Sequence, residues 1–152
     1  MDLGCYPVHW LRSFVGEEPA VVEASYRPNP MGADETVQAI LRFPSGVQGR
    51  VLASMAADEV FDASIVARGT RGTLEVDNAV LPHNGHSVRL TIGGLLRTFT
   101  VGADETYDYQ LQAVVAALAG GPALPTEADD FVANMTTIDA IYGAAGLVRD
   151  VP

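Results

Sequence analysis

Three side chains near the start of the chain have types and spacings suited to proton transfer. Asp2, Tyr6 and His9 are separated by four and three residues, so they would share one face of a helix. A carboxylate, a phenol and an imidazole on one face can hold a substrate hydroxyl and pass a proton. The same spacing fits a structural role, in which Asp2 caps the helix, Tyr6 packs and His9 makes a hydrogen bond. Because short spacing matches are common, spacing alone favours the structural role.

Two other pairs of side chains are weaker candidates for chemistry. His83 and His86 flank an Asn-Gly dipeptide and would face each other across a turn, but a metal site needs three or four ligands. Cys5 and His9 are four residues apart, yet no third group is at hand to orient the pair, and Pro7 lies between them. We therefore expect no metal site, and we expect Cys5 to be a small buried thiol.

The charge of the chain excludes several classes of function. The net charge is −10, and all nine basic residues are arginines. A nucleic-acid partner or an anionic membrane surface is disfavoured by this charge. The absence of lysine excludes a Schiff-base or phosphate-loop lysine in this chain. The glycines of 46–49 and 69–72 lie between expected strands and open no helix, so neither segment is a nucleotide fingerprint.

The cysteine content and hydropathy point to a compartment. The single cysteine, Cys5, cannot form an intrachain disulfide, which fits a reducing environment. The first twenty residues lack the basic and then apolar pattern of a signal peptide, and no run of 18 apolar residues exists. We expect a cytoplasmic protein with no membrane partner.

The elements that would position these side chains can be read from periodicity. Residues 3–15 favour a helix that starts near Gly4 to Tyr6 because of Pro7, and Gly16 suits its end. Short alternating runs joined by turns predict antiparallel strands at 20–27, 36–43, 47–55, 63–68, 73–76, 79–83, 86–92 and 95–101, with a hairpin at Asn84-Gly85.

Two further helices complete the expected fold. One covers 107–119, with an apolar stripe of Tyr107, Leu111, Val114, Val115 and Leu118, and the next begins at Thr126, whose hydroxyl could cap the amide of Asp129. The order predicts an α+β fold: one open, mostly antiparallel sheet with helices on one face, in a single domain over 1–152.

The opening and closing segments also bear a family resemblance. Residues 1–9, Met-Asp-Leu-Gly-Cys-Tyr-Pro-Val-His, resemble the Asp-x-Gly-x-(His or Tyr) motif in the first helix of the C-terminal domain of the glucose–fructose oxidoreductase/inositol dehydrogenase (Gfo/Idh/MocA) family. Residues 124–142 are similar to the last helix of that domain, and residues 105–111 to the helix before it. The resemblance covers about Asp2 to Leu147.

This resemblance implies a substrate-binding domain without its cofactor domain. In complete members a Rossmann domain comes first, binds NAD or NADP, and supplies a lysine that joins an aspartate and a His or Tyr of the motif. Asp2 matches the aspartate and Tyr6 the His/Tyr position, whereas His9 falls where the family varies. The chain has neither lysine nor a Gly-rich strand–turn–helix unit, so it should bind no cofactor alone. A fragment, a truncated reading frame or half of a split protein is implied.

The expected function is therefore that of a substrate-binding and dimerisation domain. The resemblance implies an NAD(P)-dependent parent acting on a sugar, polyol or related alcohol; the alternative is a non-enzymatic binding or assembly module with a relict site. A hydrolase using Asp2 lacks a partner carboxylate. Helices should cover one face of the sheet. The opposite face should be the interface of a homodimer, and its mixed polar and aliphatic residues are Thr36, Gln38, Ile40, Arg42, Leu52 and Val66.

Overall fold

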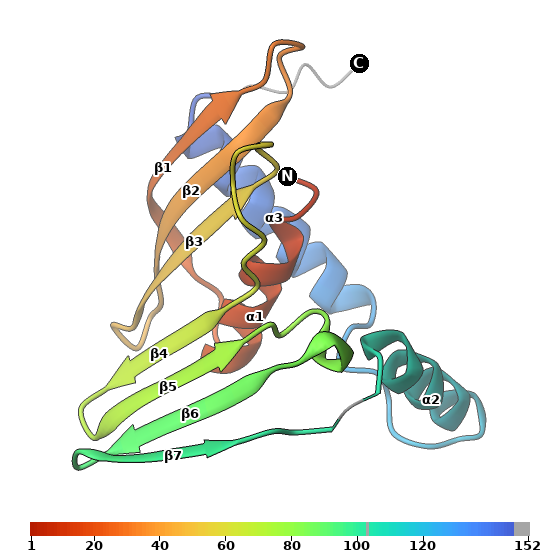
Figure 1. Ribbon diagram of the computed structural model, residues 1–152. Coiled ribbons are helices and arrows are strands. Elements are labelled where there is room, and N and C mark those ends of the chain that lie inside the picture. Colours follow the sequence, from red (N-terminus) through yellow and green to blue (C-terminus); the bar gives the residue numbers. More distant parts are fainter. Residues whose placement is uncertain (103, 148–152) are drawn as a thin grey trace. The chain divides into compact units, whose positions relative to one another are not determined.

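The fold consists of helices and two open antiparallel sheets (Figure 1). The computed structural model describes residues 1–102 and 104–147. One compact unit contains Met1–Glu59 and the chain from Pro125, and the other contains Val60–Leu124. The α+β class and the open antiparallel arrangement are as predicted. Hydrogen bonds, however, group the strands into a sheet of three and a sheet of four rather than one continuous sheet.

The first unit packs two helices on one side of a three-stranded sheet. Its elements are α1 (Cys5–Val15), β1 (Ala20–Pro28), β2 (Asp34–Arg42), β3 (Gln48–Ser54) and α3 (Ala128–Ala144), and the sheet order is β1-β2-β3. Burial alternates along β2 because successive side chains point to opposite faces. The prediction that helices cover the apolar side of the sheet is confirmed. The core between sheet and helices contains Val8, Val37, Ala39, Leu41, Phe43, Val51, Ile138, Ile141 and Tyr142.

The ends of these helices differ in detail from the sequence predictions. Helix α1 begins at Cys5 with Gly4 as its N-cap and no capping side chain, so Asp2 does not cap it. Gly16 ends α1 with a φ of 74° and donates its N–H to the carbonyl of Arg12, as predicted. Helix α3 begins at Ala128 with Glu127 as its N-cap and no capping side chain, one residue later than a cap at Thr126 would require, so Thr126 does not cap it.

The second unit is a four-stranded meander followed by a helix. It contains β4 (Ile65–Gly69), β5 (Gly72–Asp77), the 3-10 turn η1 (Pro82–Asn84), β6 (Ser87–Ile92), β7 (Leu95–Phe99) and α2 (Thr106–Leu118). The strands pair antiparallel in the order β4-β5-β6-β7. Residues 69–72 form the predicted tight connection, since Gly69 and Gly72 are paired across it.

The predicted hairpin at Asn84-Gly85 is wrong. Residues 82–84 form η1, and β5 pairs directly with β6 across the segment between them. The Asn78 amide holds this segment, because its Nδ2 donates to the carbonyls of Leu81 and Gly85, both at 2.7 Å. His86 adds two bonds, to the Pro82 carbonyl at 3.1 Å and from the Val101 N–H at 2.8 Å. These hydrogen bonds come from side chains outside the Asn84-Gly85 dipeptide, so the turn preference of the dipeptide does not predict them.

Helix α2 forms where it was predicted but buries none of its residues. Its expected stripe is exposed except for the half-buried Val114; Leu118 is 84% exposed. The amphipathic spacing therefore predicted the helix correctly, but it did not predict that the apolar stripe would stay exposed. No helix among residues 1–102 and 104–147 is both long and apolar enough to cross a membrane.

Candidate active site

The first turn of α1 presents the two residues that the sequence ranked highest. Asp2 lies in the turn that leads into the helix, and Tyr6 is its second residue. Asp2 is exposed, and Tyr6 is 47% exposed. An exposed phenol and a nearby carboxylate can meet a substrate hydroxyl, whereas a packed tyrosine could not. The structure therefore removes the helix-cap role of Asp2, while the ring of Tyr6 is only half buried.

His9 lies one turn further along α1 and is held from two sides. Its Nδ1 is 3.2 Å from Oδ2 of Asp130 on α3, and its Nε2 is 3.3 Å from the Ser13 hydroxyl. The side chain is 28% exposed. With both ring nitrogens engaged, His9 has the bonding of a structural histidine.

Beneath these residues, Arg12 joins α1 to α3 and to the segment after α1. Arg12 is only 6% exposed. Its Nε and Nη2 donate to the two carboxylate oxygens of Glu18, both at 2.7 Å, and its Nη1 donates to Asp130 Oδ1 at 2.9 Å. The hydrogen bond from Arg12 is the main cause that lowers the pKa of Glu18. A buried guanidinium is stable only when its donors are paired in this way.

Asn134 extends this network to the start of α1. Its Oδ1 accepts from Arg12 Nη1 at 3.3 Å, and its Nδ2 donates to the Cys5 carbonyl at 3.2 Å. Cys5 in turn donates its thiol to the Asp2 carbonyl at 3.1 Å. Burial is the main cause that raises the pKa of the Cys5 thiol, which therefore favours its neutral form. The turn that carries Asp2 and Tyr6 is thus tied to α3 through side chains.

Sequence reasoning missed the role of Arg12, Asp130 and Asn134. Asp130 and Asn134 lie in the closing segment that carried the resemblance, but their contacts with α1 span 118 and 129 residues of chain. Arg12 had one usable signal, since it is a charged residue on the helix face that contains Val8, one turn earlier.

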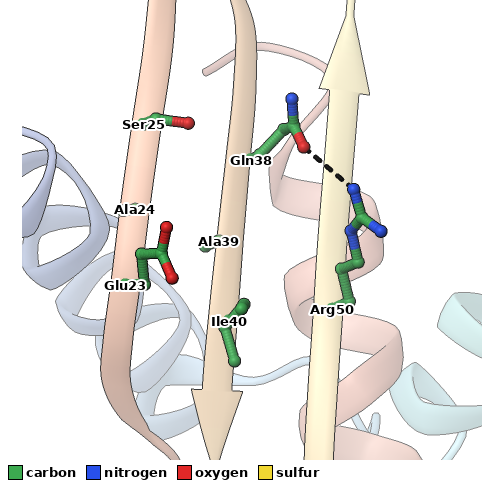
Figure 2. A pocket seen from close by; sticks show the side chains of 7 residues that line it. All are labelled: Glu23, Ala24, Ser25, Gln38, Ala39, Ile40 and Arg50. Carbon is green, nitrogen blue, oxygen red and sulfur yellow. Dashed lines mark hydrogen bonds between the residues drawn. The ribbon is translucent and has the colours of Figure 1, made fainter.

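Among the described residues, the hollow in the surface beside Asp2 is very small. The hollow there, lined by Met1–Gly4 and by residues of β2 and β3, has a volume of about 10 Å³. A small-molecule site usually needs about 300 Å³ or more. Any substrate at Tyr6 would need walls that these residues do not supply. A hollow of about 310 Å³ lies on the face of the β1–β3 sheet away from the helices (Figure 2).

The histidine pair and the two glycine segments of the sequence have other roles in the fold. No group of three or more His, Cys, Asp or Glu side chains within 1–102 and 104–147 could hold a metal ion. Both nitrogens of His86 are engaged, one by the Pro82 carbonyl and the other by the Val101 N–H, so it is not free to pair with His83. The glycine segments at 46–49 and 69–72 connect antiparallel strands, not a strand to a helix.

Comparison with known proteins finds one family model and several relatives that are named as dehydrogenases. A family model described as the GFO/IDH/MocA C-terminal domain matches residues 1–75. The chain is 29% identical over 147 residues to D-xylose 1-dehydrogenase (NADP(+)) 2 of Haloferax volcanii, covering 95% of this chain and 45% of the relative. It is 31% identical over 77 residues to trans-1,2-dihydrobenzene-1,2-diol dehydrogenase of Bos taurus, covering 50% of this chain and 22% of the relative.

Solved structures share the fold over nearly the whole chain. KijD10, a 3-ketoreductase from Actinomadura kijaniata solved with NADP, superposes with a TM-score of 0.81 at 18% identity, covering 94% of this chain and 46% of that one. An NAD binding oxidoreductase from Klebsiella pneumoniae gives a TM-score of 0.75 at 20% identity, covering 98% and 50%. The chain therefore spans half or less of the length of these relatives.

Proposed function

Because the chain belongs, through residues 1–75, to the GFO/IDH/MocA C-terminal domain family, we propose that it is the substrate-binding and dimerisation part of an NAD(P)-dependent oxidoreductase acting on a sugar, polyol or related alcohol. The relatives support this substrate class, since one is named a D-xylose dehydrogenase and another a dihydrodiol dehydrogenase. The single cysteine fits a reducing, cytoplasmic setting for such an enzyme.

The observation that carries the proposal is the exposure of Tyr6, in the first turn of α1, and of Asp2, in the turn that leads into it. Oxidation of an alcohol releases the hydroxyl proton, and reduction of a ketone requires one at the same oxygen. Tyr6 Oη would exchange that proton with the substrate oxygen, and the Asp2 carboxylate would accept a hydrogen bond from a substrate hydroxyl and orient it. Both groups are open to a ligand.

The cofactor would be held outside this chain. A bound nicotinamide would supply or accept the hydride in the complete enzyme. The described residues offer no site for it, and the chain has no lysine to assist Tyr6. These groups, and the missing walls around Asp2, would come from the other half of the enzyme, consistent with relatives of about twice this length.

The outer face of the β1–β3 sheet is the proposed dimer surface. The side of the sheet opposite α1 and α3 carries mixed polar and aliphatic residues, with Ile40 36% and Leu52 58% exposed. Aliphatic groups on an open sheet face are typical of an interface of moderate hydrophobicity. We infer a homodimer in which the same face meets itself.

Expression together with the coding sequence that precedes the chain in its genome tests the proposal. The longer product should oxidise D-xylose or a related sugar, polyol or diol with NADP⁺ or NAD⁺, followed as reduced cofactor. If that product is inactive with the whole panel, calorimetric titration of the 152-residue chain with the same compounds examines the binding-module alternative. A longer product that folds and neither turns over nor binds any of these compounds would refute the proposed function.

A further inference from the structure

The outer face of the β1–β3 sheet carries one row of side chains with opposite charges at its two ends. Glu23 on β1 pairs in register with Ile40 on β2, and Ile40 pairs in register with Arg50 on β3. Residues opposite each other on neighbouring strands share a face. Figure 2 shows the three side chains on the same side of the sheet, with Glu23 and Arg50 on either side of Ile40.

Neither charge of this row has an ion-pair partner among the residues that the structure describes. Neighbouring strands lie about 4.8 Å apart, so Glu23 and Arg50 start roughly 10 Å apart at the backbone with Ile40 between them. Arg50 donates only to the neutral Gln38 amide, at 3.0 Å. By contrast, Arg27 on the same face already pairs with Glu35, at 3.1 Å. The row therefore offers one unpaired acid and one unpaired base at matched distances from β2.

In a symmetric dimer, the direction of the two-fold axis determines whether Glu23 faces Arg50 or Glu23 of the second copy. If the axis lies in the interface and runs along β2, it exchanges the two edges of the row. Glu23 then faces Arg50 of the partner subunit, and Arg50 faces Glu23 of the partner subunit. If the axis lies along the row instead, each charge faces its own copy, which is repulsive. An isologous interface makes each contact twice, so the favourable arrangement gains two ion pairs.

We propose that the homodimer is built on two symmetric Glu23–Arg50 ion pairs, one on each side of an axis that follows β2. This inference rests on the dimer given under the proposed function and adds its register. Ile40 lies at the centre, where it would meet the same residue of the second copy and help to fill the hollow of about 310 Å³. Arg42 lies at the last residue of β2, at the margin of the face, where it can remain in water. Charge complementarity of this kind fixes register as well as affinity.

Charge reversal and mixing of the 152-residue chain test the pairing. Glu23→Arg places two Arg–Arg contacts in each dimer, and Arg50→Glu places two Glu–Glu contacts there. Each variant alone should raise the dimer dissociation constant at least about tenfold, since opposed like charges in an interface are costly. An equimolar mixture of the two variants should dimerise as tightly as the wild type, because the heterodimer regains one Arg–Glu contact on each side. The double variant Glu23→Arg/Arg50→Glu should also dimerise.

Sedimentation velocity gives the mass, and one tagged variant in the mixture identifies the heterodimer by capture of the untagged one. Matched controls reverse exposed charges away from this face: Asp58→Arg, and Arg71→Glu in the β4–β5 turn. Both should keep the wild-type mass, and circular dichroism shows that all variants fold. A monomeric wild type would overturn the proposed dimer itself. A dimeric wild type whose single variants stay dimeric, or whose mixture stays monomeric, would overturn the pairing alone.

Discussion

Tyr6 and His9 lie one turn apart on α1 but have different surroundings. Tyr6 is 47% exposed, while both ring nitrogens of His9 have partners within 3.3 Å. A proton-transfer group must be reachable by the substrate, so exposure supports Tyr6 over His9 as the donor. The distinction depends on Asp130, which reaches His9 from α3.

Removal of the Tyr6 hydroxyl should affect turnover and not folding. In the longer product, Tyr6→Phe keeps the ring and removes only the proton donor, so kcat should fall by roughly 10²–10⁴. Steady-state assays of cofactor reduction measure this, with Tyr107→Phe on α2 as the control, since Tyr107 is 72% exposed. Unchanged turnover in Tyr6→Phe would show that another residue moves the proton.

Glu18 should make folding of the chain sensitive to acid. Its pKa is lowered from 4.5 in the folded state, chiefly by the hydrogen bond from Arg12. The stabilisation is therefore present above pH 4.5 and is lost as the pH falls through the folded pKa. Because Glu18 is 60% exposed, solvent screening keeps the effect to about 1 kcal/mol or less.

Urea unfolding at a series of acidic pH values tests this contribution. Glu18→Gln should flatten the loss of unfolding free energy below pH 4.5 relative to wild type. Glu59→Gln, in an exposed segment after β3, should retain the wild-type slope. Equal slopes in wild type and Glu18→Gln would mean that the Arg12 bond does not form in solution.

At the scale of elements, α1 is held on α3 by a polar network in addition to the core. Val8 of α1 is fully buried with Ile141 of α3, while Arg12, Asp130 and Asn134 connect the polar edges of the two helices. A polar network of this kind is favourable only when every buried donor is paired. The turn that carries Asp2 and Tyr6 therefore depends on α3, which closes the chain.

Truncation of Asp130 should loosen this contact. Asp130→Ala removes an acceptor from the buried Arg12 and the partner of His9, so unfolding free energy should fall by about 1–3 kcal/mol. Asp129→Ala is the matched control, because it changes an acid in the same first turn of α3. Urea unfolding followed by circular dichroism measures both. Equal losses in the two variants would show that only the charge at the helix start matters.

At the scale of the whole molecule, the chain alone should not bind a nicotinamide cofactor. The passage from β7 to α2 carries a single glycine, Gly102, rather than a Gly-rich turn, and a net charge of −10 opposes a phosphorylated ligand. Fluorescence titration with NADH and NADPH should show no saturation. A dissociation constant in the low micromolar range would contradict this expectation.

The wild-type chain should have twice its chain mass of 16.0 kDa in solution at tens of micromolar. Ile40→Arg or Leu52→Arg, on the proposed dimer face, should shift light scattering towards one chain while helix content is retained. Val60→Arg is the control, since Val60 is an aliphatic residue, 87% exposed, in the segment before β4. A single-chain mass for the wild type would leave the aliphatic positions of the sheet face unexplained.

The sequence by itself determined the class of fold and most elements. Alternation in residues 36–43 identified both the buried and the open side of β2, because the two-residue period of a strand is a local property. The spacing of Asp2 and Tyr6 with the glycine between them was likewise local, and it predicted that they flank the start of a helix, where the structure has α1.

Tertiary structure decided what these local patterns could not contain. The contacts of Arg12 with Asp130 and of Asn134 with Cys5 join residues more than 100 positions apart, so no short pattern predicts them. The Asn84-Gly85 dipeptide predicted a hairpin, but residues 82–84 form a 3-10 turn instead, held by hydrogen bonds between Asn78 and Gly85 and between His86 and Pro82. The stripe on α2 predicted a helix but not a covering surface, because periodicity gives the side of an element and not its partner.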